Sequence, residues 1–191
     1  MQCVLFVAIF HLNVSGRGSG AELEVRAGMN VTPYYEHDGI TIYHGDFSDF
    51  AGRSDIRADL LCTDPPYGIG ASRRSFYTHG KRACYQARDF GDSDWDDHPA
   101  PACLIDAARA ACSDAVIWGG NYFELPPSMR WLIWDKQNDG MSFADCEMAW
   151  TNQRKATRIF RNRWNGANQQ RCGSVKEPRM HPTMKPLPLM K

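Results

Sequence analysis

The feature that most constrains the fold is a largely apolar run, Ala58–Thr63 (ADLLCT), which stops at Asp64-Pro65-Pro66-Tyr67. A short apolar run of this kind is typical of a strand that is buried on both faces, as in a parallel sheet. The run cannot continue as a central strand because proline has no N–H to donate to a neighbouring strand. We therefore expect a buried strand that carries Asp64 at its carboxyl end.

Other segments read as strands and helices that alternate along the chain. Strands are expected at residues 40–44, 115–118, 131–134 and Cys146–Thr151, and helices at residues 47–56 and 102–112. This alternation predicts an α/β fold with a mostly parallel sheet. Because open α/β sheets bind ligands outside the carboxyl ends of their strands, the turn at Asp64 is a candidate functional site.

Composition narrows the class of protein. The 191 residues allow one domain with a core. The seven Cys form no C-x-x-C pair and the six His form no cluster, so neither a metal site nor a disulfide framework is predicted, and a cytoplasmic location is expected. The apolar first ten residues are too short to cross a bilayer, so no membrane partner is expected.

The domain is expected to begin at Met29. Residues 1–28 contain a Gly- and Ser-rich stretch and are predicted to be an unstructured or non-native extension. Residues 29–191 would then form a partial domain, with a long polar loop at 68–101.

Charge is distributed unevenly along a chain of zero net charge. Residues 1–150 hold 12 basic and 21 acidic residues, whereas residues 151–191 hold 10 basic residues and one acid, Glu177. A basic end can bind phosphate groups. On charge alone, a solvated basic surface is the favoured interpretation.

The turn at Asp64 has the groups that an aromatic amine needs in order to react. The lone pair of such an amine is delocalised into the ring, and acceptors placed against its N–H groups would restore it. The Asp64 carboxylate and the Pro65 carbonyl are two such acceptors, and Pro66 keeps the backbone extended. Tyr67 offers a flat face on which a base can stack. A plain strand-ending turn is the alternative, but the place after a buried strand favours the functional interpretation.

Several motifs together resemble those of DNA amino-methyltransferases. Residues 63–68 (TDPPYG) resemble the D-P-P-Y motif, and residues 180–186 (MHPTMKP) resemble the H-P-T-x-K-P motif that precedes the cofactor strand in the group where D-P-P-Y comes first. Residues 114–123, 130–136 and 145–152 are similar to successive strand regions of phage and bacterial adenine methyltransferases. The resemblance runs from about residue 30 to the last residue.

The resemblance implies an incomplete Rossmann-like fold that uses S-adenosylmethionine to methylate adenine N6 of a flipped base. Asp64 and Pro65 would hold the amine and Tyr67 would stack on the base. Asp46 matches the acid that contacts the cofactor adenine, although a turn residue is an equal alternative. The residues that match the border of the cofactor pocket are His181, Thr183 and Lys185, for which the alternative is a Pro-rich connector.

Double-stranded DNA is the expected partner, because a base must leave the duplex to reach such a pocket and the protein must hold the DNA meanwhile. Residues 153–179 match the position of the target-recognition segment and combine basic with aromatic residues. The candidate DNA-binding residues are Arg73, Arg74, Arg154, Lys155, Arg158, Arg161, Arg163 and Arg171.

The family pattern continues with a Gly-rich cofactor loop and further strands that residues 1–191 do not contain. We therefore expect a fragment that lacks the C-terminal cofactor strands, does not bind the cofactor strongly and does not transfer methyl groups robustly. The alternatives that stay open are a cytosine-N4 methyltransferase, a catalytically inactive DNA-binding remnant, and a methyltransferase that acts on RNA or on protein amides. The resemblance implies adenine rather than cytosine, because the first position of the D-P-P-Y motif holds an acid, Asp64. The sequence predicts neither the recognition site nor the oligomeric state.

Overall fold

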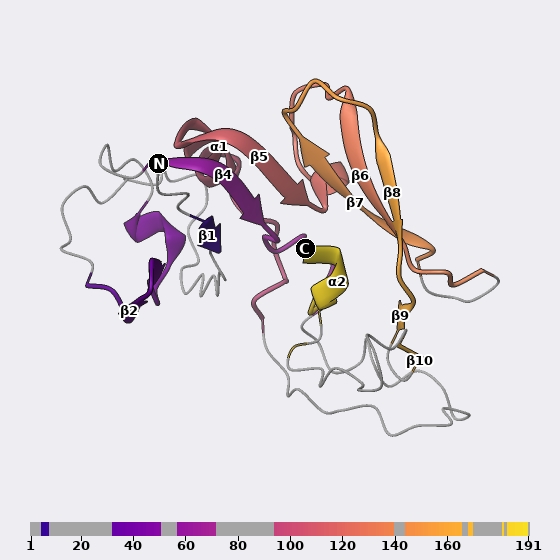
Figure 1. Cartoon of the computed structure of the whole chain (residues 1–191), viewed down its shortest axis with the longest axis horizontal. Helices are drawn as coiled ribbons and strands as arrows, with labels where there is room; N and C mark the ends of the chain where they lie inside the picture. Colours follow the sequence, from indigo (N-terminus) through magenta and orange to yellow (C-terminus); the bar gives the residue numbers. More distant parts are fainter. Residues whose placement is uncertain are drawn as a thin grey trace.

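A six-stranded sheet forms the centre of the molecule in the computed structural model, which describes residues 5–7, 32–50, 57–71, 94–139, 144–165, 168–169, 181 and 183–190 (Figure 1). The strands lie in the order β1-β4-β5-β7-β6-β8. Their bounds are Leu5–Val7 (β1), Ala58–Thr63 (β4), Cys112–Trp118 (β5), Arg130–Asp135 (β6), Cys146–Thr151 (β7) and Arg158–Arg161 (β8).

The strand directions make this an α/β fold with a mixed sheet, so the prediction of a mostly parallel sheet is wrong. β4 runs parallel to β1 and β5, and β6 runs parallel to β8, but β7 is antiparallel to both β5 and β6. Residues 136–145 join β6 to β7, which is too short a connection for the crossover that parallel neighbours require. Apolar runs predict where strands lie but not their direction.

Helix α1, Ala102–Ala110, covers one face of β4 and β5 (Figure 1). Its buried residues Leu104, Ile105 and Ala108 recur at helical spacing and pack in one apolar cluster with Leu61, Ala115, Ile117 and Trp150 of the sheet. The predicted helix is confirmed, and it ends two residues earlier than expected.

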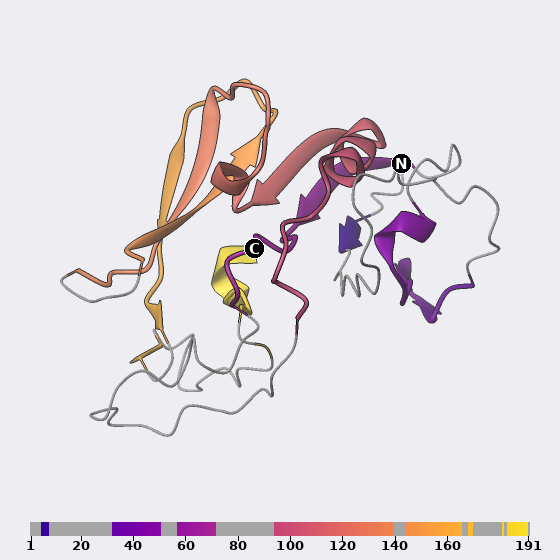
Figure 2. The same ribbon diagram turned by 180° about the vertical axis from the view of Figure 1, so that it is seen from behind.

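The opposite face of the sheet is covered by the C-terminal segment. A second cluster contains Trp118, Trp134, Ala149 and Trp164, against which Met184 and Leu189 pack. Leu189 belongs to the short helix α2, Leu187–Met190, which lies beside the ends of β4 and β5 in both views (Figures 1 and 2). Segments distant in sequence therefore meet at one end of the sheet.

Residues 40–44 do not join the main sheet, contrary to the sequence-based expectation. β3, Ile40–Ile42, pairs instead with β2, Tyr35–His37, in an antiparallel hairpin. Asp38 and Gly39 both have positive φ, 49° and 77°, as the two-residue turns that match strand twist require. The Asp-Gly pair was the available signal for this hairpin.

The remaining elements are short. A 3-10 helix, η1 (Phe47–Asp49), occupies the start of the helix expected at residues 47–56, and residues 51–56 lie outside the described chain. A second, η3 (Gly120–Tyr122), follows β5, and β9 (Trp164–Asn165) pairs with β10 (Asn168–Gln169). β1 falls within the segment predicted to be an extension. No helix among the described residues is long and apolar enough to cross a bilayer.

Candidate functional site

The turn after β4 is fixed by a buried carboxylate, Asp96. One oxygen of Asp96 accepts from the N–H groups of Tyr67 and Gly68, at 2.7 and 2.9 Å, and the other accepts from Ala71 at 2.8 Å. Asp96 is only 1% exposed, so these bonds form away from water. The turn is therefore preorganised rather than left to fluctuate.

The two prolines of the turn differ in their carbonyls. The Pro66 carbonyl accepts from the N–H of Ala100 at 3.0 Å, which ties the turn to the start of α1. Within the described residues, no hydrogen bond reaches the Pro65 carbonyl. Pro65 itself is buried, and its carbonyl lies beside Asp64 without a donor from the described residues.

Each carboxylate oxygen of Asp64 has a donor from a different part of the chain. The Tyr67 hydroxyl donates to Oδ1, and the Lys185 ammonium donates to Oδ2 over 2.7 Å. Burial, and then the neighbouring Asp64 carboxylate, raise the pKa of Tyr67 far above its ordinary value. Tyr67 therefore remains a protonated donor at physiological pH.

Lys185 bridges Asp64 to a second carboxylate, Glu147 of β7. Its Nζ lies 3.0 Å from Glu147 Oε2, while Lys136 Nζ pairs with Glu147 Oε1. The Lys185 side chain is 8% exposed, and those of Lys136 and Glu147 are 16% and 26% exposed. The result is a row of alternating charges that we call the charge row: Asp64, Lys185, Glu147 and Lys136.

The charges of the row stabilise one another against burial. Burial alone would raise the pKa of Glu147, but the ammonium groups of Lys185 and Lys136 hold it below its usual range. Burial alone would lower the pKa of Lys185, but the carboxylates of Asp64 and Glu147 raise it above its usual range. Both groups are therefore charged at neutral pH, as paired buried charges must be.

Strand register explains why these side chains share one face. Cys62 pairs with Val116 and Thr63 with Ile117, so Asp64 and Trp118 follow on the next rung. Trp118 in turn pairs with Ala149, two residues after Glu147. Because side chains alternate across a sheet, the three residues Asp64, Trp118 and Glu147 point to the face that the C-terminal segment covers. Lys185 Nζ lies 5.5 Å from the centre of the Trp118 ring.

Aromatic rings enclose Tyr67. Its ring stacks on Tyr122 with centroids 4.9 Å apart and planes 11° apart. The Phe123 ring packs edge-on against Tyr67, with centroids 6.3 Å apart. Gly119 has φ of 65°, and a Cβ there would overlap the Tyr67 ring. The expected stacking face of Tyr67 is therefore present, but Tyr122, itself 47% exposed, covers it.

The other residues of the H-P-T-x-K-P motif form a compact turn near the site. His181 Nδ1 and Thr183 Oγ1 are 3.0 Å apart. The His181 ring packs on the Trp95 ring, with ring centroids 5.2 Å apart. Trp95 precedes Asp96, so this turn packs beside the segment that fixes Tyr67. The structure thus brings His181, Thr183 and Lys185 to the D-P-P-Y end of β4.

Asp46 is not brought to this cluster. Its carboxylate accepts from the N–H of Ser48 at 2.8 Å and caps η1. In both views η1 and α2 lie well apart, with β4 between them (Figures 1 and 2). The arrangement matches the turn-residue alternative for Asp46 and places it apart from Asp64.

The candidate DNA-binding residues that the structure describes lie along one edge of the sheet. Those at 154, 155, 158, 161 and 163 are all exposed, and β8 also exposes Ile159 and Phe160. Arg161 pairs with Asp135 at 3.2 Å, a solvated contact. Arg73, Arg74 and Arg171 lie outside the described residues.

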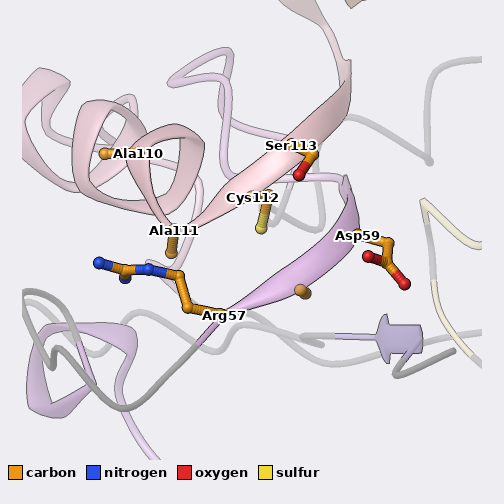
Figure 3. A pocket seen from close by; sticks show the side chains of 7 residues that line it. Arg57, Asp59, Ala110, Ala111, Cys112 and Ser113 are labelled. Carbon is orange, nitrogen blue, oxygen red and sulfur yellow. The ribbon is translucent and has the colours of Figure 1, made fainter. Parts of the chain in front are cut away.

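A shallow pocket of about 310 Å³ lies at the other end of β4 and β5, between Arg57, Asp59, Cys112 and the end of α1 (Figure 3). It is at the amino ends of these strands, whereas Asp64 is at the carboxyl end of β4. Because ligands of open α/β sheets bind at the carboxyl ends, we do not assign the site to this pocket. Among the described residues, no group of His, Cys, Asp or Glu is arranged to hold a metal ion.

Sequence reasoning missed Asp96, Glu147 and Lys136. Asp96 stands in the polar segment 68–101, where nothing in the sequence separates a buried acid from its solvated neighbours. Glu147 did carry a signal, because it is a charged residue inside an otherwise apolar strand, and such a residue needs a partner when buried. Lys136 directly follows β6, two residues after Trp134, which pairs with Glu147 in the neighbouring strand.

The chain matches no family model, and comparisons with curated proteins and with solved structures found no match. Any assignment of function therefore depends on the motifs and on the geometry of this site.

Proposed function

We propose that the chain carries the D-P-P-Y part of a Rossmann-like methyltransferase that transfers a methyl group from S-adenosylmethionine to adenine N6 of a base flipped out of DNA. The observation that carries the proposal is the contact between Asp64 and Lys185, which are 121 residues apart in the sequence. The two motifs of the resemblance thus meet at the carboxyl end of a buried strand, where such chemistry is expected.

The residues of the turn would activate the amine by accepting its two N–H groups. A carboxylate oxygen has two lone-pair directions, so Asp64 can accept from an amine while it keeps Tyr67 and Lys185. The Pro65 carbonyl would take the second N–H. A base could stack on Tyr67 once Tyr122 moves aside. After transfer, the cationic nitrogen is a strong acid and could release its extra proton to the Asp64 carboxylate.

One observation among the described residues supports the cofactor part of the proposal. When bound, S-adenosylmethionine supplies a methyl group on a sulfonium, and the S–C electron pair returns to sulfur as the amine lone pair forms the N–C bond. Among the described residues, no acceptor reaches the indole N–H of Trp118, which is buried on the Asp64 face, and it could donate to a carboxylate or hydroxyl. His181, Thr183 and Lys185 would border the cofactor, and Asp46 is not placed to join them.

A catalytically inactive DNA-binding remnant is the second candidate. Both Asp64 oxygens already have a donor, and Tyr122 covers Tyr67, so the site is stable as it stands. This candidate uses only the exposed basic residues along β8, and it predicts DNA binding that weakens steeply with salt and does not depend on cofactor.

Methyl transfer to DNA tests the proposal directly. The chain is incubated with methyl-labelled S-adenosylmethionine and either adenine-containing or adenine-free duplexes, and the nucleosides are analysed by mass spectrometry. The cofactor is supplied at saturating concentration, because this chain is expected to bind it weakly. We expect slow formation of N6-methyladenine by wild type and a loss of about 100-fold or more in Asp64→Ala, because an acceptor that acts in the transition state is removed.

Asp59→Ala is the matched control. Asp59 is an exposed carboxylate on the same strand and on the opposite face, so its removal should leave transfer unchanged. Normal transfer by Asp64→Ala would refute the catalytic role. Salt-sensitive DNA binding with no transfer by wild type would favour the remnant instead, and N4-methylcytosine as the product would reassign the target base.

A further inference from the structure

Glu147 takes no part in the mechanism proposed above, yet it is held at the site by two ammonium groups. Its Oε2 lies 3.0 Å from Lys185 Nζ and its Oε1 pairs with Lys136. Lys185 therefore donates a hydrogen bond to Asp64, which follows β4, and forms an ion pair with Glu147 of β7, whose Oε2 accepts no aligned hydrogen bond from the described residues. The four charges of the row sum to zero, and their side chains are between 8% and 29% exposed.

We propose that Glu147 is a positioning residue that shares the Lys185 ammonium with Asp64 and so keeps Asp64 available to accept from the target amine. This inference rests on the proposed methyl transfer. Glu147 acts through Lys185 because both of its oxygens face ammonium groups, and it is not placed to contact the base itself.

The argument depends on how charge changes during transfer. Positive charge moves onto the amine nitrogen, beside Asp64, and an ammonium 2.7 Å from Asp64 opposes that change. Glu147 offsets the opposition because its negative charge lies against the same ammonium. Without the Glu147 carboxylate, the Lys185 ammonium would interact with Asp64 alone, and the four-residue row would carry one net positive charge.

The register of β7 in the sheet places Glu147 beside Lys185. Strand β7 is antiparallel between β5 and β6, so Glu147 pairs with Trp134 in register and faces the C-terminal segment. Lys136, which follows β6, fixes the second oxygen. The raised pKa of Lys185, caused by both carboxylates against the opposing effect of burial, agrees with a shared ammonium.

The test compares Glu147→Gln with wild type, because glutamine keeps the shape and removes the charge. We expect kcat to fall about tenfold or more while KM for the duplex stays unchanged, since the exposed DNA-binding residues are untouched. Glu147→Asp, which keeps the charge at a shorter reach, should recover part of the loss. Glu124→Gln removes an exposed glutamate and should leave kcat unchanged.

A second readout does not depend on transfer. In protein labelled with ¹³C at lysine Cε, the Lys185 signal, assigned with Lys185→Arg, should titrate at lower pH in Glu147→Gln than in wild type. An unchanged Lys185 titration, or an unchanged kcat, overturns the inference.

The outcomes separate the two proposals. Wild-type kcat in Glu147→Gln together with an inactive Asp64→Ala overturns only the role of Glu147. Absence of transfer by wild type overturns the proposed function and this inference with it. If Glu147→Gln does not fold, the comparison is made with Glu147→Asp, for which an unchanged kcat and an unchanged Lys185 titration overturn the inference.

Discussion

The two faces of the sheet are built differently although they belong to the same strands. On the α1 face, Leu104, Ile105 and Ala108 pack against aliphatic side chains of β4 and β5. On the opposite face, the C-terminal segment is held by tryptophans and also by the charge row. One face thus has the composition of an ordinary core, and the other combines a core with buried ions.

The two faces differ in how much their contacts contribute to the stability of the fold. Apolar burial stabilises the α1 face at a gain of roughly 25 cal/mol per Å². Buried ion pairs add little net stability, because desolvation cancels much of their attraction, and their loss is costly mainly when one partner remains behind. A row of partly buried charges is therefore better explained by the proposed chemistry of the site than by a need to hold the fold together.

The largest effect on stability is expected on the α1 face. Leu104→Ala should lower the free energy of unfolding by about 2–5 kcal/mol, because it leaves a cavity between α1 and the sheet. Cys103→Ala, at an exposed position of the same helix, is the control and should change it by less than about 0.5 kcal/mol. Denaturant unfolding measures both. A small effect of Leu104→Ala would mean that α1 does not pack as described.

Gly119→Ala should have a smaller effect on stability and act on the site. The substitution costs about 1–2 kcal/mol because φ is 65°, and its Cβ also overlaps the Tyr67 ring. Gly70→Ala is the control for strain alone, since φ is 72° and nothing lies within 4 Å of its Cβ. We expect Gly119→Ala to be the more destabilising of the two and to alter Tyr67 fluorescence or NMR signals. Equal effects of the two variants would show that Tyr67 is not held against Gly119.

How much of this fold could be predicted varies from element to element. The four strands from β4 to β7 and helix α1 were found within a few residues, because apolar runs and helical spacing are local properties. The antiparallel course of β7 was missed, because an apolar strand reads alike in either direction. The hairpin of β2 and β3 was missed even though Asp38-Gly39 is a recognised hairpin turn.

The site was predictable where it depends on motifs and not where it depends on tertiary contacts. Asp64 and Lys185 were both chosen from their motifs, but nothing in the sequence indicated that they form an ion pair. Asp96 fixes the turn through backbone N–H groups, which any sequence provides, so its role leaves no local pattern. Asp46 shows the opposite case, in which a motif position lies apart from the site.

The smallest expected effect on stability is the pH dependence of the Glu147→Gln variant. It distinguishes the two faces because only the face with the charge row should respond to pH. The ammonium groups of Lys185 and Lys136, acting against burial, hold the pKa of Glu147 below its usual range. A lowered folded-state pKa gives stability that is present above the unfolded pKa of about 4.3 and is lost as the pH falls through the folded value. The stability advantage of wild type over Glu147→Gln should therefore shrink, by the order of 1 kcal/mol, below about pH 4.

The cost of Leu104→Ala should stay constant over the same range, because no charge lies at that position. Unfolding curves of the three proteins between neutral pH and about pH 3 provide the measurement. A Glu147→Gln difference that does not change with pH would mean that Glu147 is not held in its charged form by Lys185 and Lys136. The charges of the row would then contribute nothing measurable to the free energy of unfolding. The two faces of the sheet would not differ in how their stability depends on pH.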